Sequence, residues 1–161
     1  MTDPAPDPAV HDTFVLEHRY AAPPARVFAA FADPALKRGW CAEGGAHDVE
    51  AYALDFQVGG LETARYRFKG GGPFAGVGLA ADGVHLDIVP EARIVMASTM
   101  ALGGHRISAS LLTIELAADG EGGTRLVLTH QGAFFEGADG PEMRRDGWRH
   151  LLRRLDEAVA A

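Results

Sequence analysis

The residues that could do chemistry in this chain are scattered histidines, serines and tyrosines, and they form no recognised catalytic motif. The chain has no H-E-x-x-H zinc motif, no G-x-S-x-G nucleophile turn, no paired C-x-x-C and no Walker loop. Its seven histidines have spacings that fit no metal-ligand pattern. The motifs therefore predict no catalytic residue set, no metal site and no cofactor.

His130 differs from the other histidines in its position. It follows Leu126 and Leu128 at a spacing of two, so it is expected on their apolar face, on a strand that leads towards the last helix. Such a histidine either bonds a backbone carbonyl or acts as a general acid or base beside a bound ligand, and both interpretations stay open. His85 alternates with Val84 and Leu86, so we expect it to face solvent.

Several polar or flexible side chains fall on the predicted inner faces of strands. Any one of them could be packing, but an apolar surface with a few hydroxyls and methionines is typical of a lined cavity. Together with His130, the members of this set are Tyr66, Met96, Ser98, Met100 and Ser110.

The carboxylates and the one thiol provide no further candidate for catalysis. Asp55 and Asp87 are the only strand carboxylates expected to face inward, and neither has a second acid spaced to form a catalytic pair. Cys41 is the single cysteine and lies beside Trp40, so it is expected to be a packed thiol and not a nucleophile.

The last 23 residues, 139–161, must form the helix that covers these faces. Asp139 and Glu142 read as a capping pair, and Pro141 suits a first turn, where no backbone donor is needed. The arginines of this predicted helix alternate with acidic residues, which predicts a solvated, salt-bridged outer face. The apolar side recurs at helical spacing through Trp148, Leu151, Leu152, Leu155 and Val159.

The rest of the chain predicts strands around two short helices. Residues 13–20 read as a strand, and residues 25–32 as a helix that presents Phe28 to the core. A second helical turn begins at Asp33 and Pro34. From His47 onward, six runs of period two, the second of them at residues 66–68, are separated by turns too short for a crossover helix, so the sheet is antiparallel. The predicted order is strand, two short helices, six strands and a long helix.

Length and composition bound the class of protein. At 161 residues with 47% apolar and 23% charged residues, the chain fits one folded domain, residues 12–161, after a flexible tail of residues 1–11. The net charge of −7 argues against nucleic-acid binding. No run is long enough to span a membrane and no secretion signal is seen, so we expect a cytoplasmic protein with no membrane partner.

The order and spacing of many small motifs resemble the SRPBCC superfamily of START-like, helix-grip proteins. Within it, the chain is similar to bacterial homologues of the C-terminal domain of the heat-shock-protein ATPase activator. Gln57 stands where arginine is common in that family. The matching residues are Ala22, Pro23, Arg26-Val27-Phe28, Asp33-Pro34 to Trp40, Asp55, Gly59-Gly60, Gly76, Pro90-Glu91-Ala92-Arg93, Gly123-Thr124-Arg125-Leu126, Gly147-Trp148, Leu151, Leu152 and Leu155.

The resemblance implies an α+β helix-grip fold, in which a curved seven-stranded antiparallel sheet wraps around the long C-terminal helix and leaves a cavity between them. It adds Trp40 and Trp148 as cavity lining. The combined expectation for a ligand site is Phe28, Trp40, Tyr66, Met96, Met100, Ser110, His130, Trp148 and Leu152.

We expect this cavity to bind a small hydrophobic or amphipathic molecule without defined catalysis. Two alternatives stay open. One is an enzyme of the polyketide cyclase or aromatase kind that uses His130 or Tyr66 in proton transfer. The other is a co-chaperone or stress-response protein with a chaperone partner, and a homodimer also stays open.

Overall fold

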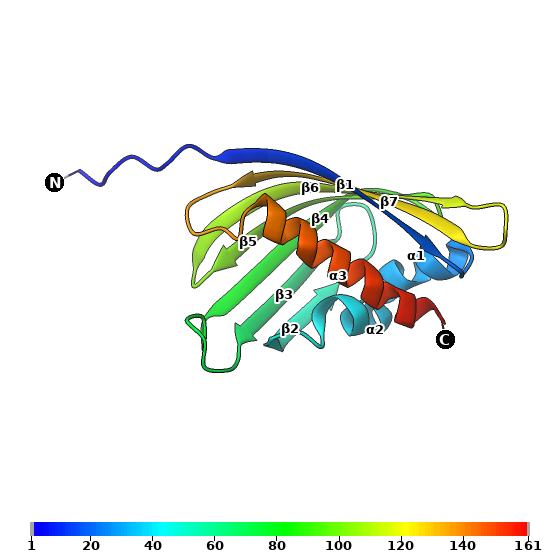
Figure 1. Ribbon diagram of the computed structural model, residues 1–161, viewed down its shortest axis with the longest axis horizontal. Helices are drawn as coiled ribbons and strands as arrows, with labels where there is room; N and C mark the ends of the chain where they lie inside the picture. The colour runs from blue at the N-terminus through cyan, green and yellow to red at the C-terminus, as the bar shows by residue number, and fades with distance from the viewer. Residues whose placement is uncertain (1, 161) are drawn as a thin grey trace.

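The computed structural model describes residues 2–160 and shows one curved antiparallel sheet with a long helix across its concave side (Figure 1). The seven strands lie in the order β1-β7-β6-β5-β4-β3-β2. This confirms the predicted α+β helix-grip fold with its seven-stranded antiparallel sheet. The strands are β1 (Val10–Tyr20), β2 (His47–Leu54), β3 (Leu61–Phe68), β4 (Gly78–Val89), β5 (Arg93–Leu102), β6 (His105–Ala118) and β7 (Thr124–Phe134).

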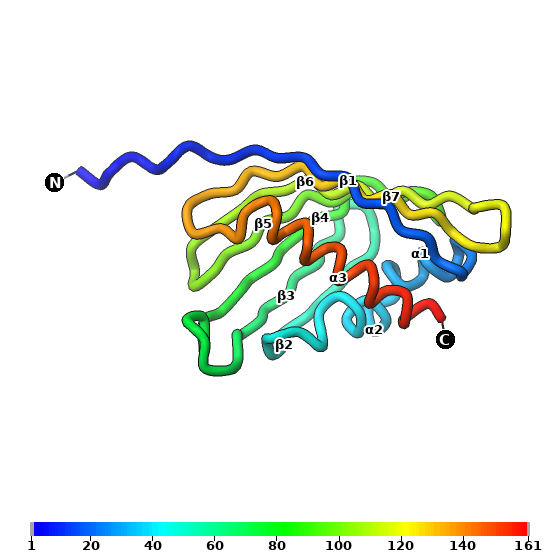
Figure 2. Tube along the Cα trace, in the orientation of Figure 1, coloured from blue at the N-terminus to red at the C-terminus, as the bar shows by residue number. Residues whose placement is uncertain are grey.

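Short helices connect β1 to β2 and close one end of the sheet (Figure 2). They are α1 (Pro24–Ala32), α2 (Pro34–Lys37) and a π-helical turn, η1 (Arg38–Ala42). The carboxylate of Asp33 accepts a hydrogen bond from the Leu36 amide at 3.0 Å, which starts α2 as predicted. The final helix, α3, spans Pro141–Ala160. No helix of the described residues is long and apolar enough to cross a membrane.

The main core lies under the C-terminal half of α3. Leu152, Leu155 and Val159 are buried there, at the helical spacing that the sequence shows. The hydroxyl of Tyr20 donates a hydrogen bond to the Leu152 carbonyl at 2.9 Å and so ties β1 to this half of the helix. The remaining core residues come from β1, β5, β6 and β7 and from α1 and η1, including Phe14, Leu16, Val27, Phe31, Trp40, Ile94, Met96, Leu112, Ile114, Leu126 and Leu128.

Small residues form a row across the concave face of the sheet. Gly83 on β4 pairs with Ser98 on β5, Ser98 pairs with Ser110 on β6, and Ser110 pairs with Gly132 on β7. Because none of these positions carries a large side chain, the row cannot reach far towards α3. The concave face is therefore filled by large side chains on one side of the row and stays hollow near β3, β4 and β5.

The structure corrects three sequence-based expectations. β1 begins at Val10, three residues before the predicted strand, so Val10 and His11 lie in the sheet and not in the tail. β3 begins at Leu61 and not near Tyr66, and this places Glu62 on the inner face. Of the two carboxylates expected to face inward, Asp55 lies outside the strands, where it accepts a hydrogen bond from Gln57, and Asp87 forms a half-exposed ion pair.

His85 faces inward, contrary to prediction, and only 1% of it is exposed. The alternation of Val84 and Leu86 suggested the opposite phase, but Leu86 is 49% exposed. The pairing of β4 with β5 also shifts between His85 and Asp87, which is a bulge that changes the alternation. Around His85 the inner face carries Gly83 and His85 itself, whereas the outer face carries Leu86, so hydrophobicity indicates the wrong face there.

Truncation of Leu155 should test the role of the C-terminal half of α3. Leu155 is fully buried, so Leu155→Ala is expected to lower the free energy of unfolding by about 3 kcal/mol or more in urea denaturation. Leu151→Ala is the matched control, because Leu151 is only partly buried on the same helix and should lose clearly less. Equal losses in the two variants would contradict this description of the core.

Candidate functional site

A cavity of about 400 Å³ lies between the N-terminal half of α3 and the inner face of β3, β4 and β5. The row of small residues explains its position, because Gly83 and Ser98 form part of its floor. Its walls are mainly apolar and include Ala64, Leu79, Ala81, Met96, Met100, Leu112, Met143, Trp148 and Leu151.

Five of the nine predicted ligand-site residues line this cavity, namely Tyr66, Met96, Met100, His130 and Trp148. Four do not. Trp40 is buried behind the wall, where its indole N–H donates to the Ala30 carbonyl at 2.8 Å. Phe28 packs edge-on against Phe56, and Leu152 is buried in the main core. Ser110 pairs with Gly132 on β7. The rings of His130 and Phe134 lie over that glycine.

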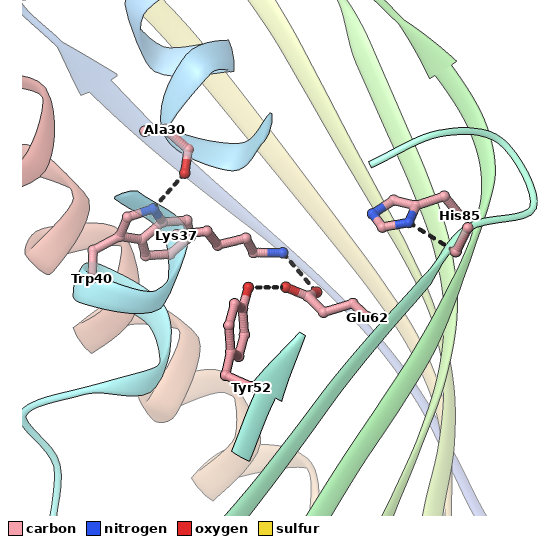
Figure 3. Close-up of polar contacts among 7 residues, drawn as sticks. Ala30, Lys37, Trp40, Tyr52, Glu62 and His85 are labelled. Atoms are coloured by element: carbon pink, nitrogen blue, oxygen red, sulfur yellow. Dashed lines mark hydrogen bonds and ion pairs between the residues drawn. The ribbon is translucent and has the colours of Figure 1, made fainter. Parts of the chain in front are cut away.

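A buried polar cluster at one end of the cavity was not predicted. Lys37 at the end of α2 donates to one oxygen of Glu62 on β3 at 2.8 Å, and the hydroxyl of Tyr52 on β2 donates to the other. Figure 3 shows both side chains converging on the Glu62 carboxylate. The side chains of Lys37 and Glu62 are only 6% and 14% exposed, and all three residues line the cavity.

Lys37 and Glu62 are both charged in the folded protein. Burial alone would raise the pKa of Glu62, but the Lys37 ammonium and the hydrogen bonds from Lys37 and Tyr52 lower it below its ordinary value. Burial likewise would lower the pKa of Lys37, whereas the Glu62 carboxylate raises it. The two charges therefore stabilise each other, and the cluster is electrically neutral.

His85 lies close to this cluster, on β4. Its Nδ1 is 3.0 Å from the Gly60 carbonyl, which can only accept, so Nδ1 carries a proton and donates to it (Figure 3). Within the described residues, Nε2 is buried and has no hydrogen-bond partner. The Phe56 ring packs edge-on against the imidazole, with the ring centroids 5.2 Å apart.

His130 occupies the cavity wall opposite α3. Its ring stacks on Phe14, with centroids 4.6 Å apart and an angle of 5° between the planes. Burial and the nearby positive charge of Arg144 lower the pKa of His130 to about 4. His130 is therefore neutral at pH 7, in agreement with its predicted place on an apolar face.

Arg144 also lines the cavity, and the sequence did not indicate this, because the helix arginines were expected on a solvated face. It is only 9% exposed. Its guanidinium forms two hydrogen bonds with Asp139, at 2.7 and 2.8 Å, and a third with the Ser108 hydroxyl at 2.9 Å. It also lies over the Phe134 ring, 5.1 Å from the centroid. These contacts attach the start of α3 to β6 and β7.

Two further ionisable groups of the cavity, Cys41 and Tyr66, are held in their neutral forms. Burial raises the pKa of Cys41 to about 11, so the thiol is protonated at pH 7, as a packed cysteine should be. Burial also raises the pKa of Tyr66 above its ordinary value, so the phenol keeps its proton. Neither side chain is activated as a nucleophile or base.

Comparison with known proteins identifies the family of this fold. A family model described as Activator of Hsp90 ATPase homolog 1-like protein matches residues 21–160. Among curated proteins, none matches the chain.

Solved structures of bacterial proteins match over nearly the whole chain. A putative uncharacterized protein from Rhizobium leguminosarum is 39% identical, with a TM-score of 0.86, and the match covers 94% of this chain and 96% of that one. The Mll3558 protein from Rhizobium loti is 43% identical, with a TM-score of 0.82 and coverage of 93% and 98%. An AHSA1-like protein from Aeromonas hydrophila shares the fold at 18% identity, with a TM-score of 0.67 and 92% of each chain covered.

The low pKa of His130 predicts a loss of stability in acid. A histidine in the unfolded chain titrates near 6.5, whereas folded His130 titrates near 4, so the unfolded chain binds more protons between these values. This one group should lower the free energy of unfolding by about 3 kcal/mol as pH falls through that window. Urea denaturation at each pH measures the loss.

The contribution of His130 can be isolated with a variant that does not titrate. His130→Phe keeps the stacking on Phe14 and should lose markedly less stability than the wild type between neutral and acid pH. His150→Gln is the control, since His150 is exposed, and it should follow the wild type. Parallel pH profiles for the wild type and His130→Phe would contradict the assignment.

The buried ion pair makes a second prediction. Lys37→Met leaves the Glu62 carboxylate buried without its cation, so it should lower the free energy of unfolding by about 3 to 5 kcal/mol. The double variant Lys37→Met with Glu62→Leu removes both charges and should regain most of that loss. Chemical denaturation at neutral pH measures both, and additive losses would show that the pair is not coupled.

Proposed function

The chain belongs to the Activator of Hsp90 ATPase homolog 1-like family, and we propose that this member binds one small amphipathic molecule between α3 and the inner face of the sheet. The main observation in support is the cavity of about 400 Å³ beneath α3, whose walls are mainly apolar. Protein interiors have few voids larger than a water molecule, and ligand pockets begin at roughly 300 Å³. A space of this size therefore favours an occupant.

The composition of the walls supports an amphipathic occupant. Leucine, methionine, alanine and tryptophan side chains cover most of the cavity surface and would take an apolar body. Methionines adapt to different shapes, which suits Met96 and Met100 to such a wall. Polar groups gather at Lys37, Glu62 and Tyr52, and they would fix the orientation of a ligand that carries one polar group.

Proton-transfer catalysis receives less support from the same side chains. A general acid or base works best with a pKa near the operating pH. The pKa of His130 is about 4, that of Cys41 is about 11, and that of Tyr66 is raised. A binding function without catalysis agrees better with these groups. The homodimer and the chaperone partner considered from the sequence stay predictions.

Filling the cavity tests the proposal. Ser98→Leu adds a larger side chain to the cavity floor, so it should weaken binding of the uncharged fluorophore prodan about tenfold or more, while the fold is kept. Fluorescence titration gives the affinity. The wild type should bind prodan saturably at one site.

Ala97→Leu is the matched control for this experiment. Ala97 is next to Ser98 on β5 but is not part of the cavity wall, so the same added leucine there should leave the affinity unchanged. Absence of saturable prodan binding by the wild type, or equal binding by Ser98→Leu, would contradict a ligand site in this cavity.

A further inference from the structure

We propose that the cavity selects uncharged ligands that carry an amide, carbonyl or hydroxyl group, and discriminates against carboxylates. This inference rests on the proposed function and adds the chemical class of the ligand. The reason is that both buried cations of the cavity wall, Lys37 and Arg144, are already paired with a carboxylate. An anionic group inside the cavity would find no buried cation without a carboxylate partner.

At one end of the cavity, the cluster of Lys37, Glu62 and Tyr52 can both donate and accept hydrogen bonds. An ammonium has three donors, and the Lys37 Nζ uses one of them on Glu62 at 2.8 Å. A carboxylate has about four acceptor positions, and Glu62 uses one for Lys37 and one for Tyr52. A neutral group such as an amide, which both donates and accepts, is therefore complementary to this cluster.

At the other end, the positive charge of Arg144 is already balanced by the Asp139 carboxylate. The Arg144 guanidinium is held by both oxygens of Asp139 and by the Ser108 hydroxyl. The neighbouring His130 is neutral at pH 7 and offers no charge. This end therefore tolerates an apolar or neutral group.

The electrostatic energy of the cavity disfavours an anionic ligand. Moving a carboxylate out of water costs several kcal/mol unless a cation compensates it. Here the Glu62 carboxylate would repel it, and Lys37 is already neutralised. Arg154 also lies at the cavity, but its guanidinium donates to the Gly39 and Glu43 carbonyls at the exposed rim, where solvent screens its charge.

A pair of probes that differ only in charge tests the inference. Naphthamide and naphthoate, substituted at the same ring position, have nearly the same shape. Isothermal titration calorimetry at pH 7 should give wild-type affinity for naphthamide about tenfold or more above that for naphthoate. Equal affinity, tighter binding of naphthoate, or no naphthamide binding by protein that binds prodan would overturn the inference and leave the proposed function standing.

Removing the compensating carboxylate should change the preference. Glu62→Gln leaves the Lys37 ammonium unpaired, so the affinity for naphthoate relative to naphthamide should rise about tenfold or more. Glu43→Gln is the matched control, because it removes the same charge from an exposed ion pair at the rim of the cavity. Glu43→Gln should keep the wild-type preference. The same shift in both variants would overturn the inference.

A second variant keeps the test decisive if Glu62→Gln does not fold. Lys37→Met with Glu62→Leu removes the cluster without leaving a buried charge. In this variant naphthamide should bind about tenfold more weakly than in the wild type, while unsubstituted naphthalene should bind equally well. Unchanged naphthamide affinity would overturn the role of the cluster. If the wild type bound none of these probes, prodan included, the result would instead contradict the proposed function.

Discussion

The structure depends on the unequal packing of α3 along its length. Its C-terminal half is buried against the sheet and α1 through Leu152, Leu155 and Val159. Its N-terminal half is attached through polar contacts, chiefly those of Arg144 with Asp139 and Ser108. A helix held by apolar packing at one end and by hydrogen bonds at the other can stand away from the sheet in between. The cavity occupies that space.

The sheet contributes to the same space through the sizes of its side chains. Gly83 and Ser98 face each other across β4 and β5, so no large group rises from this part of the concave surface. A leucine at Ser98 would bury more apolar surface and favour folding. Small residues at central strand positions therefore forgo stability, and that is consistent with a space kept for a ligand.

The energetics of the buried ion pair are also consistent with a space kept for a ligand. Replacement of a buried pair by apolar residues of similar volume is often neutral or stabilising, so stability alone does not account for Lys37 and Glu62. Their carboxylate also accepts a hydrogen bond from Tyr52, and all three side chains meet the cavity. Under the proposed function, this neutral polar cluster would orient and select a ligand, which apolar replacements would not do.

Most of the fold could be predicted from periodicity. The helical spacing of Leu152, Leu155 and Val159 identified the buried face of α3, and the period of two identified the antiparallel strands. These signals are strong because a large apolar surface must leave water in each case. The prediction was wrong for His85, because around it the inner face of β4 carries Gly83 and the outer face carries Leu86.

The candidate site was only partly predictable, because the same signal is weakest where a cavity is formed. Tyr66 was identified as inward-facing, and Glu62 lies four residues before it in the same period-two phase. Residues 61–65, however, do not alternate apolar and polar side chains as a half-buried strand does. Arg144 was placed with the solvated arginines because its partners, Asp139 and Ser108, come together only in the folded chain. A buried charge is stable only beside its partner, so its location follows from tertiary contacts and not from local sequence.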